Sequence, residues 1–288
     1  ANNLALLGVA FIDKEKRIIT SKIEHPSVLN PCRQLEEQGV EVHYLDVDGL
    51  GRIDMDDLEA QITESTALIS LQHANSETGV LQNIKRASEI ARNKGILFHT
   101  DAVQSVAKIP FDLKNYPVDL LSISAHKFYG PKGVGALYVR KGTPALFSPL
   151  CGGNQEKKRR GGTENVAGIM GFGKACELAN ENISETSKLE DLRDYFHNRV
   201  CELIPRTELW GDKANRLPNT LNLGFDGVAG DTLLIALDME GVAVSTGSAC
   251  SSGTGLPSPV LRAMAVSYTH LRAHETDSYL VCRLLLEK

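Results

Sequence analysis

Short apolar runs alternate with amphipathic segments along the first half of the chain. Helical periodicity starts near Val28, Asp54 and Ile84, and Gly39 and Gly95 stand where two of these helices should end. The apolar or alternating runs that predict strands are 17–22, 40–45, 66–71, 96–101, 118–124 and 135–140. Because apolar strands that alternate with helices are typical of a covered parallel sheet, we expect an α/β fold.

The pattern changes after about residue 145. Two long helices are predicted over 166–182 and 187–203. They are followed by a strand over 220–224, a helix over 231–239 and a strand over 242–245. We therefore expect a large domain over 1–182 and a smaller α+β domain from about residue 183.

Polar side chains gather at or just after the ends of the predicted strands. They are His25, Asn75, Asp101, Gln104, Ser124, His126 and Lys127. In open α/β sheets the ligand binds beyond the carboxyl ends of the strands. The sequence therefore predicts a site at this edge.

Lys127 is the most informative of these residues. It follows a buried strand and precedes a Gly-Pro turn at 130–131. Partial burial would disfavour its ammonium form and lower its pKa, as a Schiff-base lysine requires. Taken alone, the same pattern also fits a surface lysine in a tight hairpin.

Two further segments suggest chemistry. The Gly-rich, basic stretch 151–163 precedes a helix that begins near Asn165, which suits an anion, although a mobile surface loop is an alternative. Cys250 lies among small residues in a loop where a thiolate could reach a substrate, although a small residue in a turn is the alternative.

Composition narrows the class of protein. The 288 residues are 42% hydrophobic and 23% charged, with a net charge of −5, which gives no electrostatic case for nucleic acid or an anionic membrane. No apolar run approaches the length of a membrane span, and no signal peptide is recognised. The six cysteines are scattered without disulfide-like spacing, so we expect a reducing, cytoplasmic location.

Six segments in order resemble the cysteine desulfurases of the NifS/IscS type, over roughly residues 1–265. The segments are 20–25, 73–79, 99–105, 122–133, 160–165 and 245–250. These proteins are pyridoxal 5'-phosphate (PLP) enzymes of the aminotransferase class V family. The resemblance implies fold-type I, which is aspartate aminotransferase-like. That fold has a mainly parallel, seven-stranded type of sheet in the large domain and a smaller α+β C-terminal domain.

The resemblance also implies a role for each residue at the site. Lys127 would bind PLP covalently and move the proton at Cα, Asp101 would face the pyridine nitrogen, and His25 would stack on the ring. Asn75 and Gln104 would bond near the phenolic oxygen. The phosphate would be held by Ser124, His126 and, from a partner subunit, Thr163.

Cys250 would take the sulfur of L-cysteine as a persulfide and leave alanine. The implied partners are a second copy of the chain in a homodimer and sulfur-acceptor or scaffold proteins, as in iron–sulfur cluster assembly.

Both ends depart from the family pattern. A phosphate-binding G-A-T-E-S turn would precede Asn2, and a substrate-carboxylate arginine would follow Met264; neither Arg272 nor Arg283 lies in a family motif. We expect both domains to be incomplete and residues 266–288 to be a non-family tail. For residues 1–288 alone we expect weak retention of PLP and negligible activity.

Three alternatives stay open at this point. A metal-dependent enzyme could use His25, His73, His99, His126 and Asp101, although their spacing matches no standard zinc set. The chain could also be another class V enzyme, such as a selenocysteine lyase. It could instead be a catalytically inactive fragment of the fold.

Overall fold

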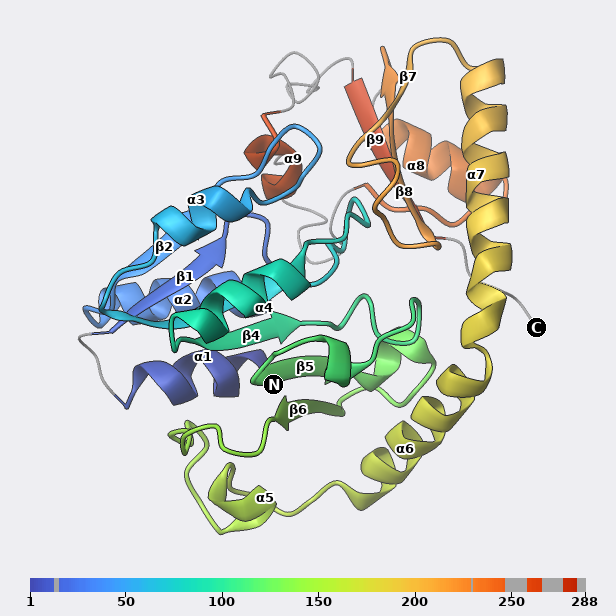
Figure 1. Ribbon diagram of the computed structural model, residues 1–288. Helices are drawn as coiled ribbons and strands as arrows, with labels where there is room; N and C mark the ends of the chain where they lie inside the picture. Colours follow the sequence, from blue (N-terminus) through green and yellow to red (C-terminus); the bar gives the residue numbers. More distant parts are fainter. Residues whose placement is uncertain (13–15, 229, 247–257, 266–276, 284–288) are drawn as a thin grey trace. The chain divides into compact units, whose positions relative to one another are not determined.

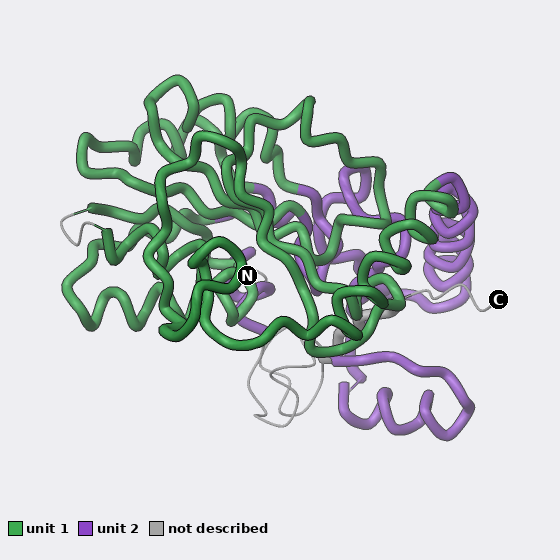
Figure 2. The backbone as a smooth tube through the Cα atoms, turned by 90° about the horizontal axis from the view of Figure 1, so that it is seen from below, with its two compact units in different colours: residues 1–46, 53–73, 82–183 green, residues 47–52, 74–81, 184–288 purple. Residues whose placement is uncertain are grey.

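The computed structural model describes residues 1–12, 16–228, 230–246, 258–265 and 277–283. These residues divide into two compact units (Figure 2). Unit 1 contains residues 1–46, 53–73 and 82–183, and unit 2 contains residues 47–52, 74–81 and 184–288.

Unit 1 is built on a six-stranded sheet (Figure 1). The strands, in sheet order, are β2 (Val42–Leu45), β1 (Arg17–Ser21), β3 (Thr66–Gln72), β4 (Leu97–Asp101), β5 (Leu120–Ser124) and β6 (Gly135–Val139). The first five run parallel to one another, and β6 pairs antiparallel with β5. The predicted α/β fold with a mainly parallel sheet is confirmed.

Side chains at the N-termini of the helices explain several of their starting points. Asp54 caps α3 (Met55–Ala60), Asn83 caps α4 (Ile84–Asn93) and Asn165 caps α6 (Val166–Glu181). The remaining helices of unit 1 are α1 (Asn2–Ala10), α2 (Pro26–Glu37), α5 (Gln155–Lys158) and the 3₁₀ turns η1 (Leu113–Asn115) and η2 (Ala125–Phe128).

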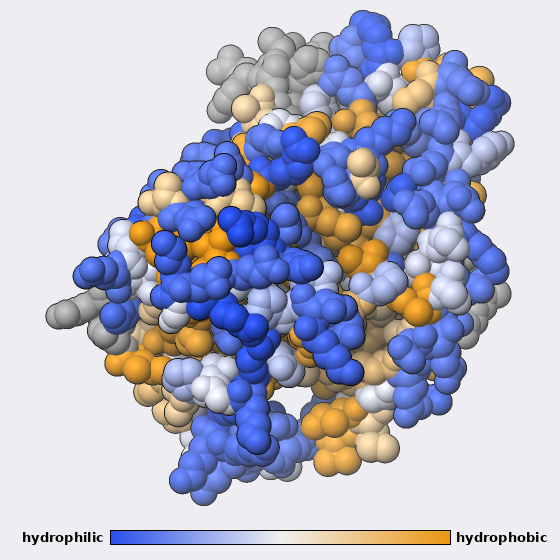
Figure 3. Space-filling model, in the orientation of Figure 1, coloured by the Kyte–Doolittle hydropathy of each residue, from blue (hydrophilic) through white to orange (hydrophobic). Residues whose placement is uncertain are grey.

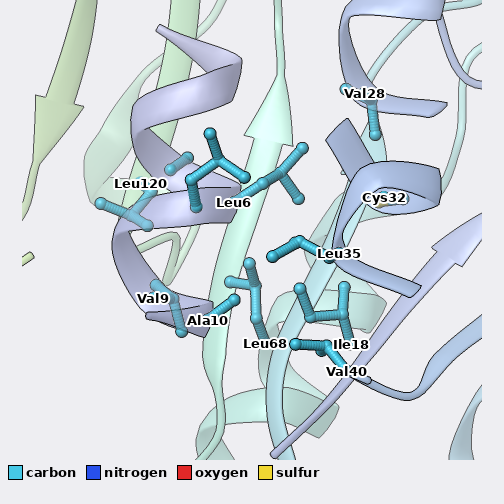
Figure 4. Close-up of a cluster of buried hydrophobic side chains, with 12 residues drawn as sticks. Leu6, Val9, Ala10, Ile18, Val28, Cys32, Leu35, Val40, Leu68 and Leu120 are labelled. Carbon is cyan, nitrogen blue, oxygen red and sulfur yellow. The ribbon is translucent and has the colours of Figure 1, made fainter. Parts of the chain in front are cut away.

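The helices α1 and α2 bury their apolar side chains against the sheet (Figure 4). Leu6 of α1 and Leu35 of α2 meet Leu68 of β3, and all three side chains are fully buried. The apolar residues of the N-terminal segment and of β3 therefore stabilise one face of the sheet.

Truncation of a side chain in this core should lower the stability of the folded protein. We expect Leu68→Ala to lower the free energy of unfolding by about 2–5 kcal/mol, because it removes buried methyl groups and leaves a cavity. Leu178→Ala is the matched control, since Leu178 of α6 is 40% exposed. Urea titration of both variants checks the prediction, and equal losses would contradict it.

Unit 2 contains a three-stranded antiparallel sheet in the order β7 (Thr207–Leu209), β8 (Thr220–Asp226) and β9 (Asp277–Arg283). Its helices are α7 (Thr186–Leu203), α8 (Gly230–Met239) and α9 (Pro259–Ala263), and the 3₁₀ turn η3 (Ile183–Glu185) lies at the division between the units. The strand β9 lies within the stretch that the sequence suggested was a non-family tail.

The strand predicted over 242–245 does not form. The backbone N–H of Val242 donates to the carbonyl of Leu237 at 2.8 Å, and Gly241 has φ +80°. This bond closes the end of α8, as in a helix C-cap with a left-handed glycine, so the chain turns instead of extending. Only Ser245 of this segment has a strand-like bridge.

Hydrophilic residues cover much of the face shown in Figure 3, with hydrophobic positions interspersed among them. Among the described residues, no helix has both the length and the apolar character needed to cross a membrane.

Candidate active site

The carboxyl ends of β4 and β5 lie side by side in unit 1. Asp101, the last residue of β4, pairs with Ser122 of β5, and β5 ends two residues later at Ser124. The short turn η2, which contains His126 and Lys127, follows at once. Parallel pairing therefore brings Asp101 and the segment 124–127 to one edge of the sheet.

Asp101 is held from two sides. Its Oδ1 atom accepts a hydrogen bond from the backbone N–H of Val103 at 3.0 Å, and its Oδ2 atom accepts one from Nδ2 of Asn2 at 2.7 Å. The residue is 7% exposed. Gln104 lies in the same turn, buried, and its side-chain oxygen accepts from Nζ of Lys108 at 3.1 Å.

His25 forms the N-cap of α2, where its Nδ1 atom accepts from the backbone N–H of Ser27 at 3.1 Å. Burial lowers the pKa of His25, the positive charge of Lys127 lowers it further, and the negative charge of Asp101 opposes both. The imidazole is therefore within electrostatic reach of both residues.

The turn η2 presents its polar groups close together. The Oγ atom of Ser124 and the Nδ1 atom of His126 are 2.8 Å apart, and Lys127 is half-buried. The turn closes through Tyr129, which has a left-handed backbone with φ +65°, and through Gly130. A Cβ atom on Gly130 would lie 2.8 Å from that of Ala125, so the turn needs glycine there.

Glu24 is a residue of this edge that the sequence did not single out. Its Oε1 atom accepts from Oγ of Ser21 at 2.6 Å and from the backbone N–H of Gln72 at 3.0 Å. The side chain of Gln72 donates to the carbonyl of Ile23 at 2.7 Å. These bonds tie the turn before His25 to the end of β3. The sequence signal that could have identified Glu24 is a carboxylate that lies directly before a site histidine and follows a fully buried strand.

Complete burial raises the pKa of Glu24 from 4.5 to about 8, although its hydrogen bonds oppose the rise. Between these two pKa values the carboxyl group of Glu24 is protonated in the folded protein and ionised in the unfolded chain. The corresponding stability is therefore present below the unfolded pKa and is lost as the pH rises through about 8.

Glu24→Gln should remove this loss, because the neutral amide keeps the oxygen acceptor and does not ionise. We expect the variant to gain about 2–4 kcal/mol of unfolding free energy over the parent protein between about pH 5 and pH 9. Urea unfolding across that range measures it, with Glu64→Gln at an exposed position as the control. A constant difference between Glu24→Gln and the parent at all pH values would contradict it.

The histidines do not converge as a metal site would require. His99 is fully buried between two strands, with Nδ1 2.8 Å from Oγ of Ser70 and Nε2 2.9 Å from Oγ of Ser122. Burial lowers its pKa to about 3. Within the described ranges, no group of three or more His, Cys, Asp or Glu residues could hold a metal ion.

None of the contacts described above involves the predicted residues Asn75, Thr163 and Cys250. Asn75 belongs to unit 2, where its Oδ1 atom accepts from the backbone N–H groups of Glu77 and Thr78 at 2.8 and 2.9 Å. Thr163 is exposed in the Gly-rich loop, and its carbonyl accepts from Arg160 at 3.2 Å. Cys250 lies outside the described residues.

The comparisons with known proteins agree with one another. The chain is 54% identical to "Cysteine desulfurase IscS" of Dictyoglomus turgidum over 92% of this chain and 68% of that protein. It is 44% identical to "Cysteine desulfurase" of Klebsiella pneumoniae over 98% of this chain and 70% of that one. The resemblance to cysteine desulfurases is thereby confirmed.

Solved structures are similar over the same span. A "NIFS-LIKE PROTEIN" superposes with a TM-score of 0.88 and 36% identity, covering 98% of this chain and 74% of that one. "SspA in complex with cysteine" gives a TM-score of 0.81 and 34% identity, covering 98% and 78%. The fold-type I assignment is confirmed.

The family model described as "Aminotransferase class-V" matches residues 1–274, which extends past residue 265, where the resemblance was expected to end. Because this match covers nearly the whole chain, the chain belongs to the aminotransferase class-V family.

Proposed function

We propose that this protein is a PLP-dependent cysteine desulfurase, which removes sulfur from L-cysteine, releases L-alanine and holds the sulfur on Cys250. The observation that carries the proposal is the placement of Asp101 and Lys127 at the ends of the neighbouring strands β4 and β5. The names of the relatives and the cysteine complex of SspA support the choice of substrate.

The residues at this edge fit PLP in the chemistry of their groups. A buried carboxylate is available for the pyridine nitrogen, a half-buried amine for the aldehyde, and a hydroxyl beside an imidazole for the phosphate. When bound, PLP supplies an acceptor for the electron pair that the substrate carbon must release, which no side chain offers.

Lys127 would bind the cofactor covalently and afterwards move the proton at Cα of the substrate. Lys127 is half-buried and lies in the turn that follows β5. Asp101 would keep the pyridine nitrogen protonated, since its carboxylate is fixed by Val103 and Asn2. Gln104 and Asn75 would bond near the phenolic oxygen.

Cys250 would act as the sulfur acceptor. Its thiolate attacks the substrate sulfur and forms a sulfur–sulfur bond. The carbon–sulfur bond breaks, with its electron pair remaining on the carbon. That carbon then takes up a proton to give alanine, and the persulfide stays on the protein.

We further propose that the protein works as a homodimer in which Thr163 reaches the phosphate bound to the partner. Large apolar side chains of unit 1 are exposed, among them Val166 (66%) and Met170 (70%) shortly after Thr163 in the sequence, and Tyr129 (82%) directly after η2. The persulfide would pass to sulfur-acceptor or scaffold proteins in the cytoplasm.

The proposal is tested by the site of covalent attachment. After incubation with PLP and reduction with borohydride, peptide mass mapping should place the pyridoxyl group on Lys127. Lys132 is the internal control, because it lies only five residues further along the chain and is exposed. Labelling of Lys132, or of no lysine in a sample that has bound PLP, would refute the assignment.

A further inference from the structure

Asn2 joins the carboxylate of Asp101 to the start of α2. Its Nδ2 atom donates to Oδ2 of Asp101 at 2.7 Å and to Oγ of Ser27 at 2.8 Å. Because a carboxylate only accepts hydrogen bonds, the nitrogen of the Asn2 amide must face Asp101. Both of its hydrogens are then used. The Ser27 hydroxyl therefore accepts from Asn2 and keeps its own hydrogen to donate.

The Nδ1 atom of His25 lies where that hydrogen can go. It is 2.8 Å from Oγ of Ser27 and 3.1 Å from the backbone nitrogen of the same residue. A backbone N–H group can only donate, so Nδ1 must carry a lone pair. A neutral imidazole with a lone pair on Nδ1 has its proton on Nε2.

We propose that Ser27 and Asn2 are positioning residues that hold His25 as the neutral tautomer protonated on Nε2. Adding a second proton at Nδ1 would turn that atom from an acceptor into a donor. The backbone N–H of Ser27 would then lose its partner and the N-cap of α2 would be lost. The helix start and the protonation state of the ring are thus coupled.

Burial lowers the pKa of His25 most, and the charges around the ring act in both directions. The N-terminus of the 12-residue helix α2 disfavours a positive charge at its cap, and Lys127 from η2 does the same. Asp101 from β4 favours the imidazolium form. Burial has the largest effect, and the net result is a lowered pKa of His25.

The consequence for the site rests on the proposed function. A neutral imidazole can stack on a protonated pyridine ring without charge repulsion, whereas an imidazolium ring could not. If the neutral imidazole of His25 gave up its Nε2 proton, it would become an imidazolate anion, so His25 is not the group that takes a proton from the substrate. His25 therefore acts as a hydrogen-bond donor and stacking group, and the mobile proton of the reaction is left to Lys127.

The test is ¹⁵N nuclear magnetic resonance of the histidine rings in the full chain without added cofactor, with His25→Gln to assign the signals. We expect the Nε2–H form at neutral pH. In Ser27→Ala the titration midpoint should rise by about one pH unit, because the neutral ring loses a donor. Ser27→Thr keeps the hydroxyl and should titrate as the parent does. Asn30→Ala on the exposed side of α2 is the control.

A proton on Nδ1 in the parent protein, or an unchanged midpoint in Ser27→Ala, would overturn the proposal. The tautomer of the parent is a sufficient test even where a variant folds poorly. Because this readout needs neither PLP nor L-cysteine, its failure would be distinct from a failure of the desulfurase assignment.

Discussion

In a chain that carries the terminal segments of the family pattern, Lys127→Ala is expected to abolish covalent attachment of PLP and to lower the rate of alanine formation from L-cysteine by more than about 1000-fold. The substitution removes the amine that binds the cofactor and that moves the proton at Cα. The half-buried position of Lys127 after β5 leaves the fold intact when the side chain is shortened, because its neighbours Ala125 and Phe128 make the buried contacts of the turn.

Stopped assays with PLP in excess, with alanine measured by mass spectrometry, would check this expectation. Lys132→Ala removes a neighbouring exposed ammonium group and should leave the rate within about twofold of the parent. Equal losses in the two variants would mean that the charge of the turn, and not the Lys127 amine, is responsible.

Asp101→Asn is expected to retain bound PLP while lowering turnover by about two to three orders of magnitude. The amide has almost the same volume and keeps an oxygen for the backbone N–H of Val103. It lacks the negative charge that would keep the pyridine nitrogen protonated. The defect should therefore appear in kcat, because ground-state binding of the substrate does not depend on that proton.

Asp112→Asn is the matched control, because Asp112 caps the short turn η1 and an asparagine can do the same. Absorbance of the bound cofactor reports PLP content, and initial rates at several cysteine concentrations report kcat and KM. Near-normal kcat in Asp101→Asn would refute the electrostatic role of the carboxylate.

Local signals in the sequence were sufficient to predict most of the helices and strands of unit 1. The helix predicted to start near Ile84 and to end before Gly95 spans Ile84–Asn93, and the helix start near Asn165 coincides with the side-chain cap. Both depend on neighbours only a few residues away. The alternation of strands and helices then placed Asp101 and Lys127 at one edge, since parallel strands end on the same side.

Contacts between distant residues could not be predicted in the same way. Asn2 and Asp101 are 99 positions apart in sequence, and the bond of Glu24 to Gln72 spans 48. No periodicity marks such pairs, because the sheet brings them together only after its strands have paired. The strand expected over 242–245 is wrong for a local reason: β-branched residues suggested extension, but the bond from Val242 to Leu237 ends a helix.

The central claim is most directly tested by following the sulfur atom. Protein that carries the terminal segments of the family pattern before Asn2 and after Met264 is loaded with PLP and mixed with L-cysteine for a single turnover, and its peptides are mapped by mass without reductant. We predict one added sulfur on Cys250 and an equal amount of alanine. In Cys250→Ser we predict PLP still attached to Lys127, with neither persulfide nor alanine above background. Alanine formed equally well by Cys250→Ser, or cysteine consumed with no sulfur on any thiol of the parent protein, would contradict the account.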